Sequence, residues 1–121
     1  MSSFLIIIII HFLADFALQT NHQAQNKSAG WDWFNIALLR HVTSYSLVWA
    51  VVILAMSTPL VALGFTLVTF ICHYITDWFT SRISKPLFDD KNYHDGFVVV
   101  GADQVAHYVQ LYYTLILFDI L

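Results

Sequence analysis

The sequence predicts an all-α, polytopic membrane protein with a single four-helix domain over residues 1–121. Composition is the first reason, because 59% of the residues are hydrophobic and 11% are charged, whereas soluble domains average about 45–50% apolar and about 25% charged residues. Segment length is the second reason. A helix crosses a bilayer with about 20 apolar residues, in a range of about 17–25, and four segments of the chain meet this requirement.

These segments are predicted to form transmembrane helices over residues 3–20, 34–56, 60–82 and 97–120. The first lacks the basic start of a secretory signal, so we expect it to remain as a helix. A polar stretch ending in Gly30 then predicts a loop, and Trp31 and Trp33 mark the return to the membrane interface. The second and third segments are joined by a tight turn, because Pro59 suits the first turn of the following helix.

Basic residues predict the orientation of these helices. All of them flank or lie in the two long polar loops: Lys27, Arg40, Arg82, Lys85 and Lys91. Because basic residues accumulate on the cytoplasmic side, we expect both long loops in the cytoplasm and both termini outside. The sequence has no basic run of the kind that binds nucleic acid. The single cysteine excludes an internal disulfide framework and a Cys-x-x-Cys metal site.

Histidine and aspartate recur four residues apart in three of the apolar segments. The pairs are His11 with Asp15, His73 with Asp77, and Asp103 with His107. Side chains at positions i and i+4 lie on one face of a helix, so each pair is expected to point in one direction. At 1.5 Å per residue, the three pairs and His41 all lie within about 9–17 Å of the cytoplasmic helix ends. Seven polar side chains are therefore expected at one level of the bundle.

An internal repeat contains two of these pairs. Residues 11–16 align with residues 73–78 without gaps, and each segment is followed by a polar loop and a helix with an early histidine, His41 or His107. This pattern predicts two helical hairpins in the same orientation, related by a pseudo-twofold axis along the membrane normal.

Three aspartates inside a membrane need a compensating interaction, because each costs about 2.5–3.5 kcal/mol near the middle of a spanning helix. A divalent cation compensates well, since imidazole and carboxylate groups are its natural ligands. The sequence favours one or two divalent ions, with zinc first because it accepts mixed nitrogen and oxygen ligands, and with manganese or iron as the others. The predicted metal ligands are His11, Asp15, His41, His73, Asp77, Asp103 and His107. A proton or ion pathway and purely structural polar packing are alternative interpretations of these residues.

Four neighbouring residues are candidates for a supporting role: Gln19, Gln104, Arg40 and Tyr45. The glutamines are candidates to orient ligands or substrate, or to form interhelical hydrogen bonds. Arg40 is expected either to hold an anionic group or to extend to the lipid headgroups. Tyr45 follows His41 by one helical turn and is either a proton donor or a packing residue.

Several spaced motifs combine in one pattern: His11-x3-Asp15-x3-Gln19-Thr20, then Lys27, His41, His73-x3-Asp77 and Asp103-Gln104-x2-His107. This pattern resembles a bacterial and phage integral-membrane domain of unknown function with the signature HFLADFxLQT…H…HxxxD…DQxxH. The resemblance covers nearly the whole chain and implies a location in the bacterial inner (cytoplasmic) membrane, but it implies no established biochemistry. By distant analogy, the chain is also similar to membrane-bound metal-dependent hydrolases.

The expected function is metal-dependent hydrolysis of a lipid-linked ester or phosphoester. The metal would activate a water molecule, and Asp15, Asp77, Asp103 and His41 are the candidate general bases or proton relays. The basic loops suit an anionic lipid-linked substrate. The main alternative is a channel or transporter for protons or metal ions, which would need a homodimer to form a path. Haem binding by paired histidines and a structural role in the membrane are further alternatives.

Overall fold

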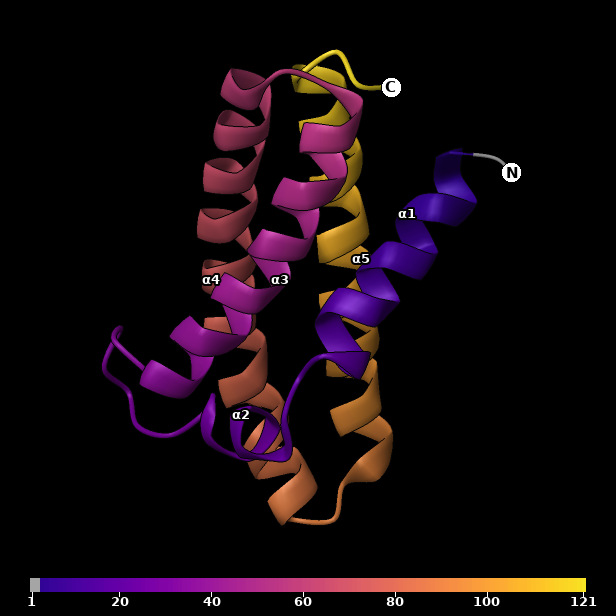
Figure 1. Cartoon of the computed structure of the whole chain (residues 1–121). Coiled ribbons are helices and arrows are strands. Elements are labelled where there is room, and N and C mark those ends of the chain that lie inside the picture. Colours follow the sequence, from indigo (N-terminus) through magenta and orange to yellow (C-terminus); the bar gives the residue numbers. More distant parts are fainter. Residues whose placement is uncertain (1–2) are drawn as a thin grey trace.

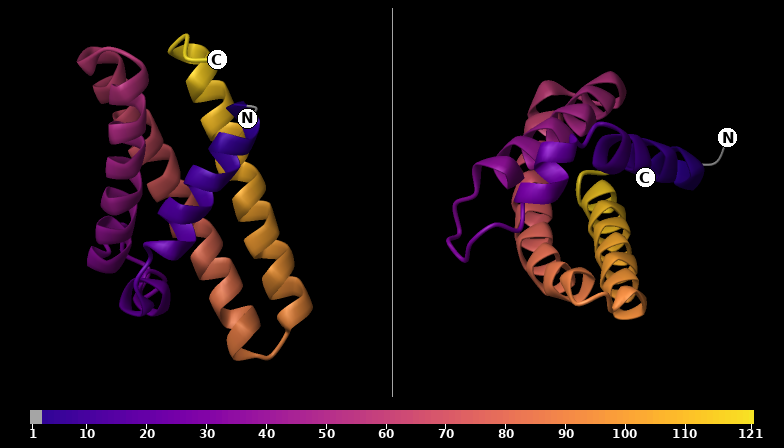
Figure 2. Two further views of the ribbon diagram at one scale, coloured as in Figure 1. Left: turned by 45° about the vertical axis from the view of Figure 1, so that its right-hand side comes forward. Right: turned by 90° about the horizontal axis from the view of Figure 1, so that it is seen from below.

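The computed structural model describes residues 3–121, and all regular structure in this range is helical. The elements are α1 (Ser3–Phe12), the π-helical turn η1 (Leu13–Ala17), α2 (Asn21–Asn26), α3 (Ile36–Met56), α4 (Pro59–Asp89) and α5 (Tyr93–Leu117). Helix α4 packs against both α3 and α5, and α1 crosses the bundle at an angle (Figure 1, Figure 2). The short helix α2 lies below the crossing point, toward the end of the bundle where α4 and α5 are joined (Figure 1).

Capping side chains set the start of three helices. Thr20 forms a capping box with Gln23 at the start of α2. The first helical segment ends at Ala17, three residues before the predicted boundary at residue 20. Asn35 accepts from the backbone N–H of Leu38 at the start of α3. Thr58 caps α4 in the same way, with proline as the first helical residue. The tight turn before Pro59 is therefore confirmed.

The third and fourth predicted segments have different boundaries in the structure. Helix α4 continues seven residues beyond position 82, through Pro86 to Asp89, and α5 begins at Tyr93 rather than at 97. Two contacts stabilise these extra turns. Lys85 donates to Asp89 at 2.6 Å, and the Phe88 ring lies so close to Gly96 that a Cβ there would sit 2.8 Å from it. Hydropathy alone ends a helix where polar residues begin, and it misses these polar turns beyond the apolar span.

The surface of the helices is apolar and the interior is partly polar. Helix α4 exposes a stripe of apolar side chains at every fourth position: Leu63, Leu67, Ile71, Ile75, Phe79 and Ile83. Among the described residues, thirteen buried side chains are hydrophobic and thirteen are polar or charged. Large contiguous apolar surfaces are rare on monomeric soluble proteins. An apolar surface around a partly polar interior suits a bundle that is surrounded by lipid.

Within residues 3–121, two helices, α3 and α4, are long and apolar enough to cross a membrane by length and composition. The first segment, α1 with η1, is a shorter apolar helix over Ser3–Ala17. The structure thus supports two candidate spans, and the four-span topology stays a prediction. The two arms of the predicted repeat also differ, because α1 and η1 comprise 10 and 5 residues whereas α4 has 31.

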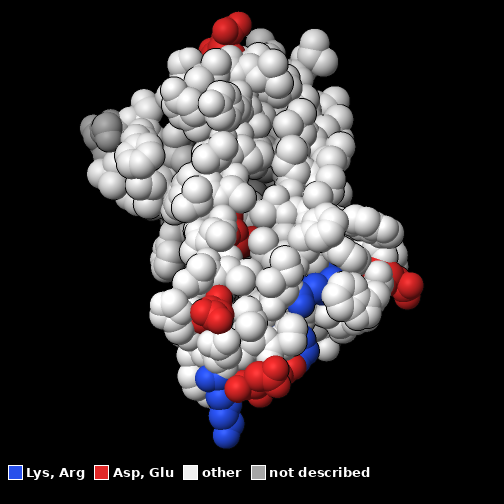
Figure 3. All heavy atoms as spheres, turned by 180° about the vertical axis from the view of Figure 1, so that it is seen from behind, with Lys and Arg blue, Asp and Glu red and all other residues white. Residues whose placement is uncertain are grey.

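Charged side chains gather at the loop end of the molecule. On the face shown in Figure 3 they lie mainly toward the end where α4 and α5 are joined, and the opposite half is largely uncharged except for an acidic group at its tip. In that uncharged half, the apolar core contains Trp49, Ile53, Phe65, Leu111 and Leu115. The polar cluster described below lies between this core and the charged end.

Arg82 ties the loop between α2 and α3 to the bundle. Its Nε donates to the carbonyl of Gly30 at 2.8 Å, and its Nη1 donates to the carbonyls of Trp78 and Lys27 at 2.9 and 3.4 Å. The guanidinium also lies 4.2 Å from the centre of the Trp78 ring. Gly30 itself has φ +72°, a conformation that glycine adopts without strain. The loop is therefore fixed by a buried cation rather than by secondary structure.

We expect Arg82→Met to destabilise the protein by about 2–3 kcal/mol, because a hydrogen bond from a charged donor contributes about 1.5–3 kcal/mol and the Gly30 carbonyl loses its donor at 2.8 Å. Thermal unfolding of the purified full chain in detergent measures the effect. Arg40→Met is the matched control, because Arg40 is exposed on α3. Equal melting temperatures for the two variants would contradict this account of the loop.

Candidate metal centre

Asp15 reaches the interior of the bundle from the π-helical turn η1. The N–H of Leu18 donates to the carbonyl of Leu13 at 3.0 Å, five residues back. The wider turn brings Ala14 and Asp15 against the core together, with exposed fractions of 0% and 5%. Single π turns inside helices often occur at functional sites. The turn thus presents the Asp15 carboxylate to the interior on the same face as His11.

Four buried side chains converge next to this turn. They come from η1, α3 and α4, and are Asp15, His41, His73 and Asp77. Each offers one nitrogen or oxygen atom, and these atoms all lie within 4.8 Å of one another. The histidine and aspartate residues predicted from the sequence to meet at one level of the bundle are therefore brought together.

The spacing of these four atoms fits a small metal ion. His41 Nε2 lies 3.0 Å from Asp15 Oδ1, 3.3 Å from His73 Nε2 and 3.4 Å from Asp77 Oδ2. His73 Nε2 lies 3.4 Å from Asp15 Oδ1 and 3.5 Å from Asp77 Oδ1. A tetrahedral zinc ion with bonds of about 2.0–2.1 Å holds its ligand atoms about 3.3–3.4 Å apart. These separations of 3.0–3.5 Å, taken to Oδ2 of Asp77 from His41 and to its Oδ1 from His73, are close to that spacing.

A second group of possible ligands shares Asp15. Asp15, Asp103 and His107 also offer atoms within 4.8 Å of one another. His107 Nε2 lies 3.3 Å from Asp103 Oδ2 and 3.0 Å from Asp77 Oδ1. The donors therefore suffice for one ion or for two adjacent ions. The expectation that each helical pair shares one face is confirmed, with nitrogen–oxygen distances of 3.6, 3.5 and 3.3 Å along the chain.

His11 lies beside the cluster but belongs to neither group of ligands. Gln104 donates through Nε2 to Asp15 at 3.1 Å and to Asp103 at 3.0 Å, so its Oε1 acts as an acceptor, and His11 Nε2 donates to it at 2.8 Å. His11 Nδ1 then accepts from the hydroxyl of Tyr45 at 2.9 Å. Both ring nitrogens are thus occupied by hydrogen bonds. His11 orients Gln104 in this arrangement instead of offering a free lone pair.

The histidines of the first group are held by their Nε2 atoms and by ring packing. The Nδ1 atoms of His41 and His73 are buried without a hydrogen-bond partner. The ring of His73 lies between those of Tyr45 and His107, with centroid distances of 4.0 and 4.1 Å. Their polar contacts therefore point entirely into the cluster, toward the position that an ion would take.

Three of the predicted supporting residues have clear positions. Tyr45 is fully buried and packs on His73, as expected for a packing residue. Its hydroxyl also lies 2.9 Å from His11 Nδ1. Gln19 has a buried Oε1 without a hydrogen-bond partner and lines a cavity beside the cluster. Arg40 is exposed on α3 and does not line that cavity.

Lys27 belongs to the spaced motif pattern, but the sequence did not predict that it reaches the cluster. Its Nζ lies 2.9 Å from Asp77 Oδ2. Burial opposes the charged form of Lys27, but the carboxylates of Asp77, Asp15 and Asp103 outweigh this and raise the pKa of Lys27 above its usual value. Charge balance was the available signal, because three buried carboxylates require cations and Lys27 is the basic residue nearest to the first pair in the sequence.

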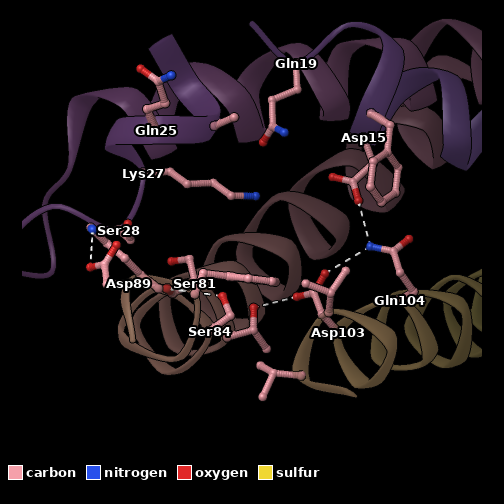
Figure 4. A pocket seen from close by; sticks show the side chains of 17 residues that line it. Asp15, Gln19, Gln25, Lys27, Ser28, Ser81, Ser84, Asp89, Asp103 and Gln104 are labelled. Carbon is pink, nitrogen blue, oxygen red and sulfur yellow. Dashed lines mark hydrogen bonds and ion pairs between the residues drawn. The ribbon is translucent and has the colours of Figure 1, made fainter. Parts of the chain in front are cut away.

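A cavity of about 450 Å³ opens beside the cluster, between α2, α4 and α5. In Figure 4, Lys27 reaches in from the α2 side opposite Ser81, while Asp15 and Asp103 lie together at one end. Asp103 is held there by the hydroxyl of Thr80, which donates to its Oδ1 at 2.6 Å. The carboxylates are thus accessible from the cavity although they are largely buried.

A family model described as a protein of unknown function (DUF3307) matches residues 3–119. The chain belongs to the DUF3307 family. This confirms the domain of unknown function that the motifs indicated, while the membrane nature and the motif signature stay predictions. The DUF3307 chain has no significant match among curated proteins or solved structures.

We expect Lys27→Met to destabilise the metal-free DUF3307 chain by about 3–5 kcal/mol, because removing one partner of a buried ion pair leaves an uncompensated charge. Zinc should restore part of this loss, since a ligand at 100 times its Kd stabilises the folded state by about 2.7 kcal/mol. Thermal unfolding with chelator and with added zinc measures both effects. Lys91→Met, on the exposed α4–α5 turn, is the control. A Lys27→Met variant as stable as this control in chelator would contradict the pairing.

Proposed function

We propose that this chain is a bacterial inner-membrane protein that binds one or two divalent metal ions in its buried His/Asp cluster and hydrolyses a lipid-linked ester or phosphoester. The convergence of four buried histidine and aspartate side chains, whose donor atoms all lie within 4.8 Å of one another, is the observation that carries the proposal. Charge supports it as well, because a divalent ion together with Lys27 balances Asp15, Asp77 and Asp103 while the histidines stay neutral.

The apolar stripe of α4 supports the membrane part of this proposal. Counted from Pro59, a hydrocarbon core of about 30 Å ends about 20 residues along the helix, close to Trp78. Trp33 stacks on Trp78 with ring centroids 4.3 Å apart, and tryptophan is enriched at this interface. His73 and Asp77 then lie just inside the membrane, and the cavity lies at the level of the headgroups. In this orientation the long loops are cytoplasmic and the termini are outside.

The cavity favours catalysis over a closed structural metal site. Catalytic zinc sites keep a coordination position open for water, whereas structural sites surround the ion with protein ligands. A bound metal ion would supply a water molecule of lowered pKa as nucleophile. Asp103 lies at the cavity end of the cluster and is oriented by Thr80 and Gln104, which suits a general base. His41 lies 3.0 Å from Asp15 and suits a proton relay.

Zinc is the preferred ion because the first group is four-coordinate with mixed nitrogen and oxygen donors. Manganese and iron take additional oxygen ligands, so they suit a site that also recruits Asp103 and water. The second group of ligands around His107 provides for a second ion.

Metal analysis of the purified full chain tests this site. We expect about one tightly held zinc ion per chain in the wild type, and a loss of at least tenfold in metal affinity in His73→Ala and Asp77→Asn. His22→Ala is the matched control, because His22 is exposed on α2. Helicity and elution volume in detergent show whether each variant is folded. A wild type that holds well below one ion after purification without chelators would refute the metal site.

Hydrolysis is tested with the chain in vesicles that contain lipid-linked esters and phosphoesters as substrates. We expect turnover that disappears with chelator and returns with zinc. Asp103→Asn should lose about 100-fold or more in rate, since general-base catalysis contributes about 10²–10⁴-fold, while its zinc content falls less than in Asp77→Asn. Turnover that persists in chelator would exclude the metal-dependent mechanism.

A chain of polar residues favours ion conduction as the second candidate function. Gln110 donates to Thr114 at 2.8 Å and to Thr69 at 3.3 Å, continuing from the cluster along α4 and α5. Beyond these polar residues lies the buried apolar core around Trp49 and Phe65, so a continuous path for ions would need a homodimer. Zinc or proton flux into vesicles, lost in Gln110→Leu, would favour conduction over hydrolysis.

A further inference from the structure

The cavity beside the cluster contains polar groups that the metal centre does not use. Ser81 is buried, lines the cavity, and its hydroxyl has no hydrogen-bond partner. The buried Oε1 of Gln19 also lacks a partner there. Buried polar groups are nearly always satisfied in native structures, and an exception calls for a bound group or water. These two atoms indicate that the cavity accepts a polar ligand.

Two lysines and three aspartates, Asp15, Asp89 and Asp103, line the cavity, so the lysines would attract an anion once a metal ion neutralises carboxylates of the cluster. Lys27 and Lys85 both line it, and they lie on opposite walls, in the α2–α3 loop and on α4. Lys85 pairs with Asp89 at 2.6 Å, but both side chains are largely exposed, and exposed ion pairs contribute little. Lys85 is therefore available to an anion at little cost. Together with the hydroxyl of Ser81, which lines the same cavity, the lysines suit a phosphate, which accepts hydrogen bonds through several oxygens.

Metal binding would also release Lys27. Its ammonium now pairs with Asp77, which is one of the four possible metal ligands. An ion on Asp77 neutralises that carboxylate and repels the ammonium. Lys27 can then turn to an anion in the cavity, where its charge still acts on Asp15 and Asp103, which line the same cavity.

We propose that the cavity binds the phosphate group of the substrate, with Lys27 and Lys85 as counter-ions and Ser81 as a hydrogen-bond donor. This inference rests on the proposed hydrolase for the bond that is cleaved, and it narrows the substrate to phosphoesters. The oxygen of water bonds to phosphorus, the phosphorus–oxygen bond to the lipid breaks with its electron pair on the departing oxygen, and the proton of the water reaches that oxygen through a carboxylate. The volume of about 450 Å³ is within the usual range of about 300–1,000 Å³ for ligand pockets.

Binding of three probes to the full chain in detergent tests the proposal, with zinc present throughout. The probes are inorganic phosphate, dioctanoyl phosphatidic acid and dioctanoyl glycerol, which has the same chains without phosphate. We expect the phosphatidic acid to bind at least tenfold more tightly than the glycerol. Lys85→Met and Ser81→Ala should each weaken it about three- to tenfold, whereas Lys85→Arg and the control Lys91→Met should leave it unchanged.

Each outcome decides one question. Tighter binding of phosphatidic acid than of phosphate supports a lipid headgroup as the source, and equal binding of both supports a free phosphate compound. Equal binding of phosphatidic acid and dioctanoyl glycerol would overturn the phosphate site, as would a Lys85→Met variant of normal helicity that binds like the wild type. Zinc content, measured on the same samples, tests the metal centre separately, so loss of the metal with retained phosphate binding would refute the proposed function and leave the anion site standing.

Discussion

Compensation of three buried carboxylates is the constraint on which the rest of the structure depends. Asp15, Asp77 and Asp103 come from three different elements and meet where the helices pack. Each would be costly alone in an apolar environment. Histidine nitrogens, the amide of Gln104 and the ammonium of Lys27 surround them. Since these partners lie far apart in the sequence, the polar cluster specifies how the helices assemble as strongly as the apolar core does.

The π turn and the loop between α2 and α3 position residues of this cluster. The π turn Leu13–Ala17 contains the buried Asp15. The loop between α2 and α3 has little regular structure, yet α4 holds it through Arg82, Trp78 and Tyr74, which all donate to its carbonyls. Lys27 can reach the cluster because that loop is fixed. Local geometry and site chemistry are thus linked through contacts that span about 50 residues of sequence.

Much of this arrangement could be predicted from periodicity. The i, i+4 spacing placed each His/Asp pair on one face, and helix length placed the pairs at one depth. The boundaries of α3 were predicted to within two residues because its apolar run and its polar flanks coincide. The π turn, the helical turns beyond Arg82 and the separation of His11 from the ligand groups were not predictable. The position of His11, for example, depends on the hydrogen bond that its Nε2 donates to Gln104, 93 residues away in the sequence, which no local pattern encodes.

The pairing of Lys27 with Asp77 has a consequence for the order of events in biogenesis. A site made only of carboxylates and neutral histidines would repel itself until an ion arrived, and helix assembly would then wait for the metal supply of the cell. A lysine provided by the chain itself removes that dependence. The helices can assemble first, and an ion, if the proposed metal site is correct, would enter later by exchanging with an ammonium that is already in place.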